Sequence, residues 1–273
     1  MVEPASIQFG FPDIQVSIAD YIATVEIQRP PLNHFDHSLI QQIADAFDAL
    51  DDTAECRVIV LASSGRVFCA GANFGTGQDD GSGSQDFTEQ GFQNTTGKLY
   101  QEATRLFKNK KPIVGAIQGA AIGGGLGLSL VPDFRIASPA ARFSANFVKL
   151  GLHQGFGVTV TLPRLIGAQA ANTMLYTGRR VSGMQALELG LVDLLVDAED
   201  LRRSAIDFAR EIAENAPLAV MSVRATMRQG LAEAVSEATL HELKEQQWLR
   251  ATEDSYEGIK AVAERRPGNF IGH

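Results

Sequence analysis

The sequence predicts an α/β fold, because strand-like and helix-like segments alternate along the chain as far as about residue 195. From about residue 198 onward only helical periodicity is present. With 273 residues, 45% of them hydrophobic and 21% charged, the chain has the composition of a globular protein with a sizeable core. We therefore expect an α/β core over residues 1–197 and a helical C-terminal region over residues 198–273.

The first part of the core combines a hairpin, a helix and a buried strand. Apolar residues alternate over residues 14–28, which predicts a hairpin that turns at residues 19–20. Residues 39–50 have apolar side chains at helical spacing, and the β-branched run 57–62 predicts a buried strand. After a loop rich in Gly and Ser, a polar helix is expected to continue to Lys111.

The later elements follow the same alternation. Residues 112–117 predict a strand, the glycine segment 119–130 predicts the start of a short helix, and residues 133–137 predict another strand, with Asp133 in a structural role at its start. Three helices are expected in the C-terminal region, over residues 201–214, 218–229 and 231–248.

Charge and cysteine content narrow the classes of partner. A net charge of −8 disfavours broad nucleic-acid binding, and no uncharged apolar run reaches the length of a membrane span. The N-terminus does not resemble a signal peptide, so we expect a cytoplasmic protein. Cys56 and Cys69 lie in apolar surroundings and are expected to be buried thiols. No spacing of His, Cys and carboxylate residues predicts a metal site.

Two segments carry a strand into a turn of small residues, namely 67–74 and 117–127. Without side chains, a ligand can lie directly on backbone N–H groups, and these donors are unpaired where a helix begins. Two such donors that converge on one oxygen form an oxyanion hole, which stabilises negative charge as it develops. The alternative is that the small residues only allow a helix to pack closely on a sheet.

These turns belong to a longer series of motifs. The matching pieces are Arg29-Pro-Pro-Leu-Asn33, Phe68-Cys-Ala-Gly-Ala-Asn73, the segment 119–133, Leu162-Pro-Arg-Leu-Ile-Gly167, Tyr176-Thr-Gly-Arg179, Ala186-Leu-Glu-Leu-Gly-Leu-Val192 and Glu257-Gly-Ile-Lys-Ala261. In this order they resemble the crotonase family, also called the enoyl-CoA hydratase/isomerase family, over nearly the whole chain. The resemblance implies a crotonase-like fold of repeated ββα units, with a helical C-terminal region that forms a homotrimer or a dimer of trimers.

The resemblance also implies a substrate and a set of site residues. The substrate would be an acyl-CoA thioester whose carbonyl oxygen becomes an enolate, with coenzyme A as part of the substrate and no separate cofactor. The family's oxyanion donors fall on the backbone N–H groups of Ala72 and Gly124. Five consecutive residues would line the path of coenzyme A, namely Ala70, Gly71, Ala72, Asn73 and Phe74. Lys260, in a basic cluster with Arg265 and Arg266, is favoured over Lys108, Lys110 and Lys111 as a contact for the phosphates.

The sequence departs from the family pattern at the positions where family members have acidic residues. The two glutamates typical of its hydratases correspond to Gly127 and Phe147, and the acid typical of many isomerases corresponds to Gly155. The substrate pocket, lined by Gly127 and Phe147, is therefore expected to be more apolar than a hydratase site. Among the remaining groups, His153 is the candidate general acid or base, because histidine titrates near neutrality. The alternative is a histidine that hydrogen-bonds a backbone carbonyl beneath the pocket.

Three kinds of function follow from these features. The first is an enzyme that stabilises a thioester enolate and carries out hydration, isomerisation or, with His153, hydrolysis of an acyl-CoA. The second is a catalytically silent acyl-CoA-binding protein. The third is RNA binding, which the acidic charge balance disfavours.

Overall fold

The computed structural model describes residues 10–73 and 93–273. The strands are β1 (Ile14–Ala19), β2 (Ile22–Ile27), β3 (Val58–Ser63), β4 (Ile113–Ile117), β5 (Ala120–Ile122), β6 (Phe134–Ala137), β7 (Arg142–Ser144), β8 (Val181–Ser182) and β9 (Leu194–Leu195). The α-helices are α1 (His37–Asp51), α3 (Lys98–Arg105), α4 (Gly124–Ser129), α5 (Val158–Thr177), α6 (Gly183–Glu188), α7 (Leu201–Ala213), α8 (Pro217–Met227), α9 (Leu231–Leu249) and α10 (Glu253–Ala263). A π-helical turn, η1 (Gln93–Gly97), precedes α3, and a 3₁₀ turn, η2 (Asn146–Leu150), follows β7.

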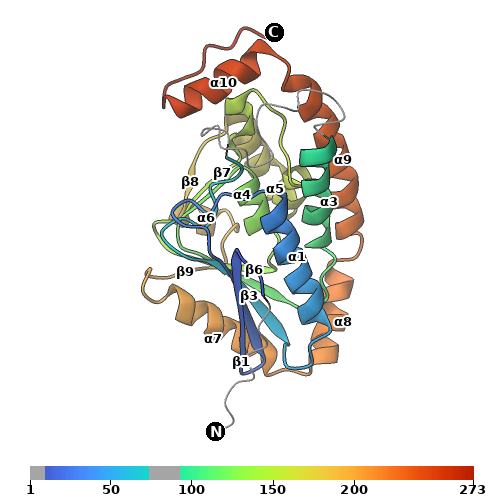
Figure 1. Ribbon diagram of the computed structural model, residues 1–273. Helices are drawn as coiled ribbons and strands as arrows, with labels where there is room; N and C mark the ends of the chain where they lie inside the picture. The colour runs from blue at the N-terminus through green and yellow to red at the C-terminus, as the bar shows by residue number, and fades with distance from the viewer. Residues whose placement is uncertain (1–9, 74–92) are drawn as a thin grey trace.

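The described strands form two sheets. The larger has the order β1-β2-β3-β4-β6-β9, in which β1 and β2 are antiparallel and the other neighbours are parallel. The smaller has the order β5-β7-β8. Figure 1 shows α7 on one side of the large sheet and α1 on the other. The α/β fold class predicted from the alternation is confirmed.

Strand β3 shows why its sequence is continuously apolar. Ile59 and Leu61 pack into the core that includes α1, whereas Val58 and Val60 pack against α7 through side chains such as Ala205. A strand covered on both faces exposes neither set of its alternating side chains to water. The run of six buried residues in β3 therefore places this strand at the centre of the fold.

Two of the predicted boundaries were wrong. The hairpin turns at Asp20 and Tyr21, one residue later than predicted, because Ala19 still pairs with Ile22. The polar helix ends at Arg105 rather than reaching Lys111. Lys111 is buried, and its ammonium donates to the carbonyls of Leu50 and Thr53 near the end of α1, so it is not available as a phosphate contact.

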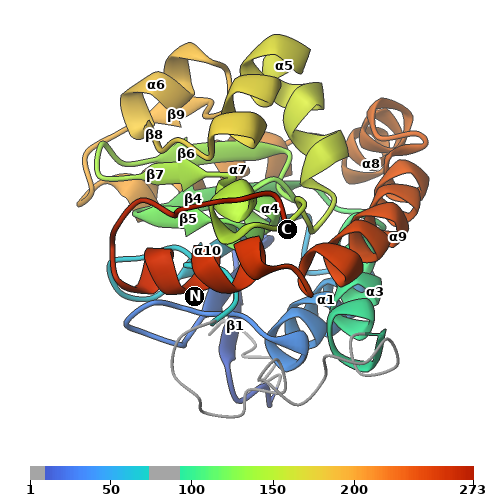
Figure 2. The same cartoon turned by 90° about the horizontal axis from the view of Figure 1, so that it is seen from above.

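The three helices predicted beyond residue 200 are present as α7, α8 and α9, and α10 follows them. Helices α1, α3 and α9 lie side by side, while α10 crosses one end of the molecule (Figures 1 and 2). Helix α10 packs on η2, where the glycine at position 258 lets its backbone lie against Leu150. The division of the chain at residue 197 stays a prediction.

The short strands of the smaller sheet were not predicted. Each has only two or three residues, which is too short for a periodic pattern to be recognised. They matter for the site, because Cys69 pairs with Ala121 of β5 and so joins the two glycine turns. In the described part of the chain, no helix is both long enough and apolar enough to cross a membrane.

Candidate active site

The two glycine turns lie against each other in the structure. The N–H of Cys69 donates to the carbonyl of Ala120 at 3.0 Å, and the N–H of Ile122 donates to the carbonyl of Cys69 at 3.1 Å. This short parallel pairing continues the smaller sheet into the first turn. Segments about fifty residues apart in sequence are thereby held at one place in the fold.

Two glycines permit this approach, and a third makes room for an aromatic ring beside it. A Cβ at Gly71 would lie 2.7 Å from the carbonyl oxygen of Ile122, and Gly71 also has a φ of +84°. A Cβ at Gly125 would overlap the carbonyl of Cys69, and one at Gly124 would overlap the ring of Phe35. Close backbone contact requires glycine at positions 71 and 125, whereas the ring of Phe35 requires it at position 124.

The predicted oxyanion donors are neighbours of these contacts. The Cβ position of Gly71 is 3.7 Å from the amide nitrogen of Gly124, and both Ala72 and Gly124 line one cavity. Gly124 is the first residue of α4, so its N–H has no partner inside the helix. Among the described residues, no acceptor is paired with the N–H of Ala72 or of Gly124.

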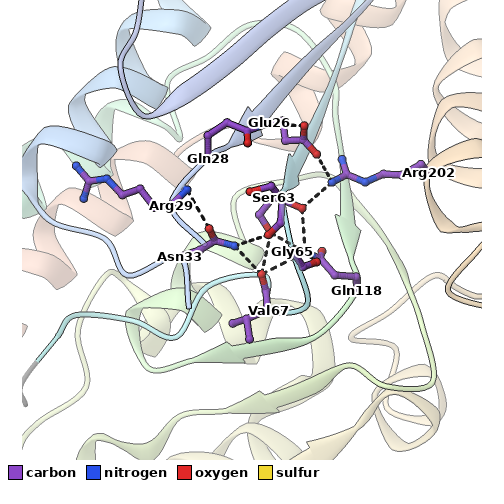
Figure 3. Close-up of polar contacts among 10 residues, drawn as sticks. Glu26, Gln28, Arg29, Asn33, Ser63, Gly65, Val67, Gln118 and Arg202 are labelled. Atoms are coloured by element: carbon purple, nitrogen blue, oxygen red, sulfur yellow. Dashed lines mark hydrogen bonds and ion pairs between the residues drawn. The ribbon is translucent and has the colours of Figure 1, made fainter. Parts of the chain in front are cut away.

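A polar network fixes the start of the first turn (Figure 3). Asn33 is fully buried, and its amide nitrogen donates to the carbonyls of Ser64 at 2.8 Å and Val67 at 2.7 Å. Its oxygen accepts from the N–H of Arg29 at 3.1 Å. Gln118, just before the second turn, also donates to the carbonyl of Val67 at 3.2 Å. The network therefore ties both turns to the ends of β2, β3 and β4.

The cavity beside the turns has a volume of about 590 Å³. Its apolar lining includes Phe35, Leu99, Ile122, Phe147, Leu150, Leu152, Phe156 and Ile259. Lys98, Arg180 and Arg250 also line it, and they are the basic side chains among its described lining apart from histidines. The site thus combines an apolar interior with cations suited to an anionic group.

One described carboxylate, Asp36, lines the cavity. It is already engaged, because it pairs with Arg29 at 2.8 Å and accepts from the N–H of Leu39 at the start of α1 at 2.8 Å. His34, also in the lining, has its Nδ1 2.9 Å from the carbonyl oxygen of Gly71. Asp36 and His34 therefore make their contacts within the wall of the cavity.

The structure brings half of the predicted site residues to this cavity. Ala70, Gly71, Ala72, Gly124 and Phe147 line it. Phe74 lies outside the described residues, and Asn73 is described but does not belong to the lining. Lys260 is exposed on α10, beside Ile259, which does line the cavity.

The three vacant acid positions have different surroundings. Gly127 is not in the described lining, because a Cβ there would lie 2.7 Å from Cβ of Phe156, whose side chain covers it. Phe147 lines the cavity and packs with Leu150 and Leu152. At Gly155, a Cβ would overlap the hydroxyl oxygen of Tyr100. The three positions at which the sequence lacks a carboxylate are therefore occupied or surrounded by apolar side chains or by the phenol of Tyr100.

His153 lies outside the described lining of the cavity. Its Nδ1 is 3.0 Å from the carbonyl oxygen of Gln154, and its ring meets the ring of His241 edge to face with centroids 5.8 Å apart. A hydrogen bond to a backbone carbonyl corresponds to the alternative raised for this residue. A catalytic role for His153 stays a prediction.

Several residues in and around the cavity could not have been found from sequence. Tyr100 and Gln246 both line it and are joined by a hydrogen bond of 3.0 Å across 146 positions. Phe156, with a φ of +63°, places its ring 5.6 Å from that of Phe35. No local signal marks these side chains, since each reaches the site through tertiary packing.

The remaining predictions concern the two cysteines and Asp133. Both cysteines are buried and free, and burial raises the pKa of Cys69 to about 12 and that of Cys56 to about 11. Asp133 accepts hydrogen bonds from the N–H of Ile113, from Arg224 and from Arg228, each at 2.8 Å. Its predicted structural role is confirmed.

Comparison with known proteins shows similarity to one family along nearly the entire chain. The family described as enoyl-CoA hydratase/isomerase matches residues 17–273. A crotonyl-CoA hydratase from Syntrophomonas wolfei is 31% identical over 266 residues, covering 96% of this chain and 99% of the relative. A carnitinyl-CoA dehydratase from Proteus mirabilis is 31% identical over 261 residues, covering 92% of this chain and 95% of the relative.

Solved structures agree with these sequence relatives. The crystal structure of an enoyl-CoA hydratase/isomerase from Pseudoalteromonas atlantica superposes with a TM-score of 0.82 at 26% identity, and the match covers 95% of this chain and 100% of that one. The resemblance seen in the motifs is therefore confirmed by sequence and by fold. The chain belongs to the enoyl-CoA hydratase/isomerase family.

Proposed function

We propose that the protein is an acyl-CoA enzyme that stabilises the enolate of a thioester with the backbone N–H groups of Ala72 and Gly124. The observation that carries this proposal is the meeting of the two glycine turns beside one cavity. The names of the relatives support the substrate class, because they are a crotonyl-CoA hydratase and a carnitinyl-CoA dehydratase. We propose no cofactor beyond the coenzyme A carried by the substrate.

The energetic argument rests on where charge develops. An oxyanion held by two fixed N–H donors in an apolar cavity is stabilised more than the ground-state carbonyl, so the donors lower the barrier to enolate formation. Loss of one such donor costs about 3 kcal/mol. The apolar walls formed by side chains such as Phe147 and Phe156 exclude water and strengthen this interaction.

The basic lining supports the coenzyme A part of the substrate. Lys98, Arg180 and Arg250 would meet its phosphates, and Lys260 on the exposed side of α10 is a further candidate. This assignment adds three residues to the one proposed from the sequence. Neutralising any one of the four should weaken coenzyme A binding more at low than at high salt.

The reaction that follows enolate formation depends on proton transfer. Since Asp36 is engaged and is the one carboxylate in the described lining, hydration by a pair of glutamates has no support here. Isomerisation, or hydration assisted by another group, remains as a reaction through the enolate. Thioester hydrolysis would instead use the same N–H donors for the tetrahedral oxyanion that forms when water adds to the carbonyl carbon and that then expels the coenzyme A thiolate. The same observation favours a second candidate, a protein that binds acyl-CoA without turning it over.

One experiment separates enolate stabilisation from proton transfer. A β-oxoacyl-CoA such as acetoacetyl-CoA enolises readily, and its enolate absorbs in the near ultraviolet. Bound at the proposed site, it should show more enolate at a given pH than it does in solution. Unchanged enolate absorbance despite saturating binding would refute the oxyanion hole. A panel of enoyl-CoA and hydroxyacyl-CoA substrates, followed by mass spectrometry, then distinguishes an enzyme from a silent binder.

We also propose that α8 and α9 form contacts between subunits in a homotrimer or a dimer of trimers. Large apolar side chains on these helices are exposed in the single chain, including Leu218 at 79%, Met227 at 67% and Trp248 at 57%. Light scattering should report a trimer or hexamer, and Leu218→Glu should shift it toward smaller species. A monomer at micromolar concentration would refute this assignment.

A further inference from the structure

A buried tyrosine and glutamine form a polar pair in the otherwise apolar part of the cavity. Tyr100 comes from α3 and Gln246 from α9, and both line the cavity together with Leu99, Phe147, Leu152 and Phe156. Tyr100 is 7% exposed and Gln246 is 5% exposed. A polar pair placed among apolar side chains is the kind of feature that sets ligand specificity.

The orientation of the glutamine amide is fixed by its partners. Its Nε2 donates to the carbonyl of His153 at 2.9 Å and to the carbonyl of Gln154 at 3.0 Å, which uses both of its protons. Its oxygen therefore faces Tyr100, and the tyrosine hydroxyl donates its single proton to that oxygen at 3.0 Å. The reverse orientation would set the amide oxygen against two carbonyls.

The surroundings of the hydroxyl oxygen leave it accessible to a further donor. The backbone N–H of Phe156 lies near the oxygen and acts to lower the pKa of the phenol, and Gly155 leaves the space that the oxygen occupies. Burial, reinforced by the nearby Glu242, raises the pKa of the phenol, so it stays protonated. Tyr100 donates its proton to Gln246, and the N–H of Phe156 can use one lone pair at most, so the hydroxyl oxygen retains at least one lone pair with no donor among the described residues.

We propose that Tyr100 is a specificity-determining residue that accepts a hydrogen bond from a hydroxyl group on the acyl chain, with Gln246 as the positioning residue that turns the tyrosine proton away. This inference rests on the proposed acyl-CoA function and names the substrate class more closely. The site prefers a hydroxyacyl thioester to the unsubstituted chain, because the hydroxyl supplies the missing donor.

The same geometry disfavours an oxo group. A ketone oxygen has only lone pairs, so it would either face the lone pair of Tyr100 or have to accept the tyrosine proton that is now donated to Gln246. In the second case the amide oxygen of Gln246 would be left buried without a partner, which is costly. The expected order of affinity is hydroxyacyl, then unsubstituted acyl, then oxoacyl at the same carbon.

The test compares dissociation constants for matched hexanoyl-CoA thioesters by titration calorimetry. The set contains the unsubstituted chain and chains with a hydroxyl or an oxo group at successive carbons. The wild type should bind one hydroxy isomer about five-fold more tightly than the unsubstituted chain, as expected for one hydrogen bond. Tyr100→Phe should abolish that preference and leave the affinity for the unsubstituted chain unchanged. Tyr176→Phe, which removes an exposed tyrosine hydroxyl, should change neither value.

A second variant tests whether Gln246 determines where the hydroxyl proton of Tyr100 points. Gln246→Met removes the acceptor of the tyrosine proton, so Tyr100 becomes free to donate and the preference should shift from the hydroxy toward the oxo chain. A purely structural role for the pair would lower all affinities together. The proposal is overturned if the wild type binds no hydroxy isomer better than the unsubstituted chain, or if Tyr100→Phe keeps the preference. If no acyl-CoA binds the wild type at all, the proposed function itself fails.

Discussion

Substituting Gly71 by alanine tests whether the two glycine turns act together. The added Cβ would lie 2.7 Å from the carbonyl oxygen of Ile122, where ordinary contact begins at 3.4 Å, so the turns must separate by about 0.7 Å. A hydrogen bond of about 2.9 Å stretched by that amount exceeds the limit for N–H···O contacts. The substitution is therefore expected to cost one oxyanion donor, about 3 kcal/mol or about 100-fold in enolate stabilisation.

The assay is the enolate absorbance of bound acetoacetyl-CoA, measured together with thermal unfolding. Gly71 has a φ of +84°, so alanine also brings a backbone cost of about 1–2 kcal/mol that has nothing to do with the turns. Gly230→Ala is the matched control, because Gly230 has a φ of +75° but nothing within 4 Å of its Cβ position. Both variants should lose stability, and only Gly71→Ala should lose the enolate signal.

A folded Gly71→Ala protein that binds acetoacetyl-CoA with the enolate absorbance of the wild type would refute the reasoning. It would mean that the spacing between the N–H groups of Ala72 and Gly124 does not matter for the bound oxygen. The glycines would then serve only for close backbone packing, which was the alternative reading of these turns.

Three further predictions follow from the surroundings of the site. Asn33→Ala should lower the free energy of unfolding in urea by about 3 kcal/mol, because it removes three hydrogen bonds to partly buried backbone groups, and a loss below about 1 kcal/mol would contradict this. Burial opposes ionisation of Asp133, but Arg224 and Arg228 outweigh it and lower its pKa, so its contribution is complete above the unfolded-state value of about 3.9 and disappears as pH falls through the folded value. Urea unfolding at several pH values should show that Asp133→Asn is less stable near pH 7 and depends less on pH in the acid range. If His153 is the general acid or base, His153→Ala should lose turnover and keep its affinity for coenzyme A; retained turnover would leave the histidine with only the hydrogen bond to the carbonyl of Gln154.

The regular elements were predictable because their signals are local. The apolar run of β3 and the helical spacing of α7, α8 and α9 appear within single segments of sequence. The end of α3 was not predictable, because Lys111 lies outside the helix and donates to carbonyls near the end of α1. The smaller sheet was also missed, since its strands are too short to show a period.

The sequence by itself determined the family, the fold class and the two turns whose glycines allow backbone to meet backbone. It also determined that carboxylates are missing at positions 127, 147 and 155. Only the tertiary structure decided what surrounds those positions, because Tyr100 of α3 and Gln246 of α9 lie 146 residues apart in sequence and meet through packing. Glycine requirements and periodicity are properties of neighbouring residues, whereas the polarity of a cavity depends on side chains that folding brings together from distant segments.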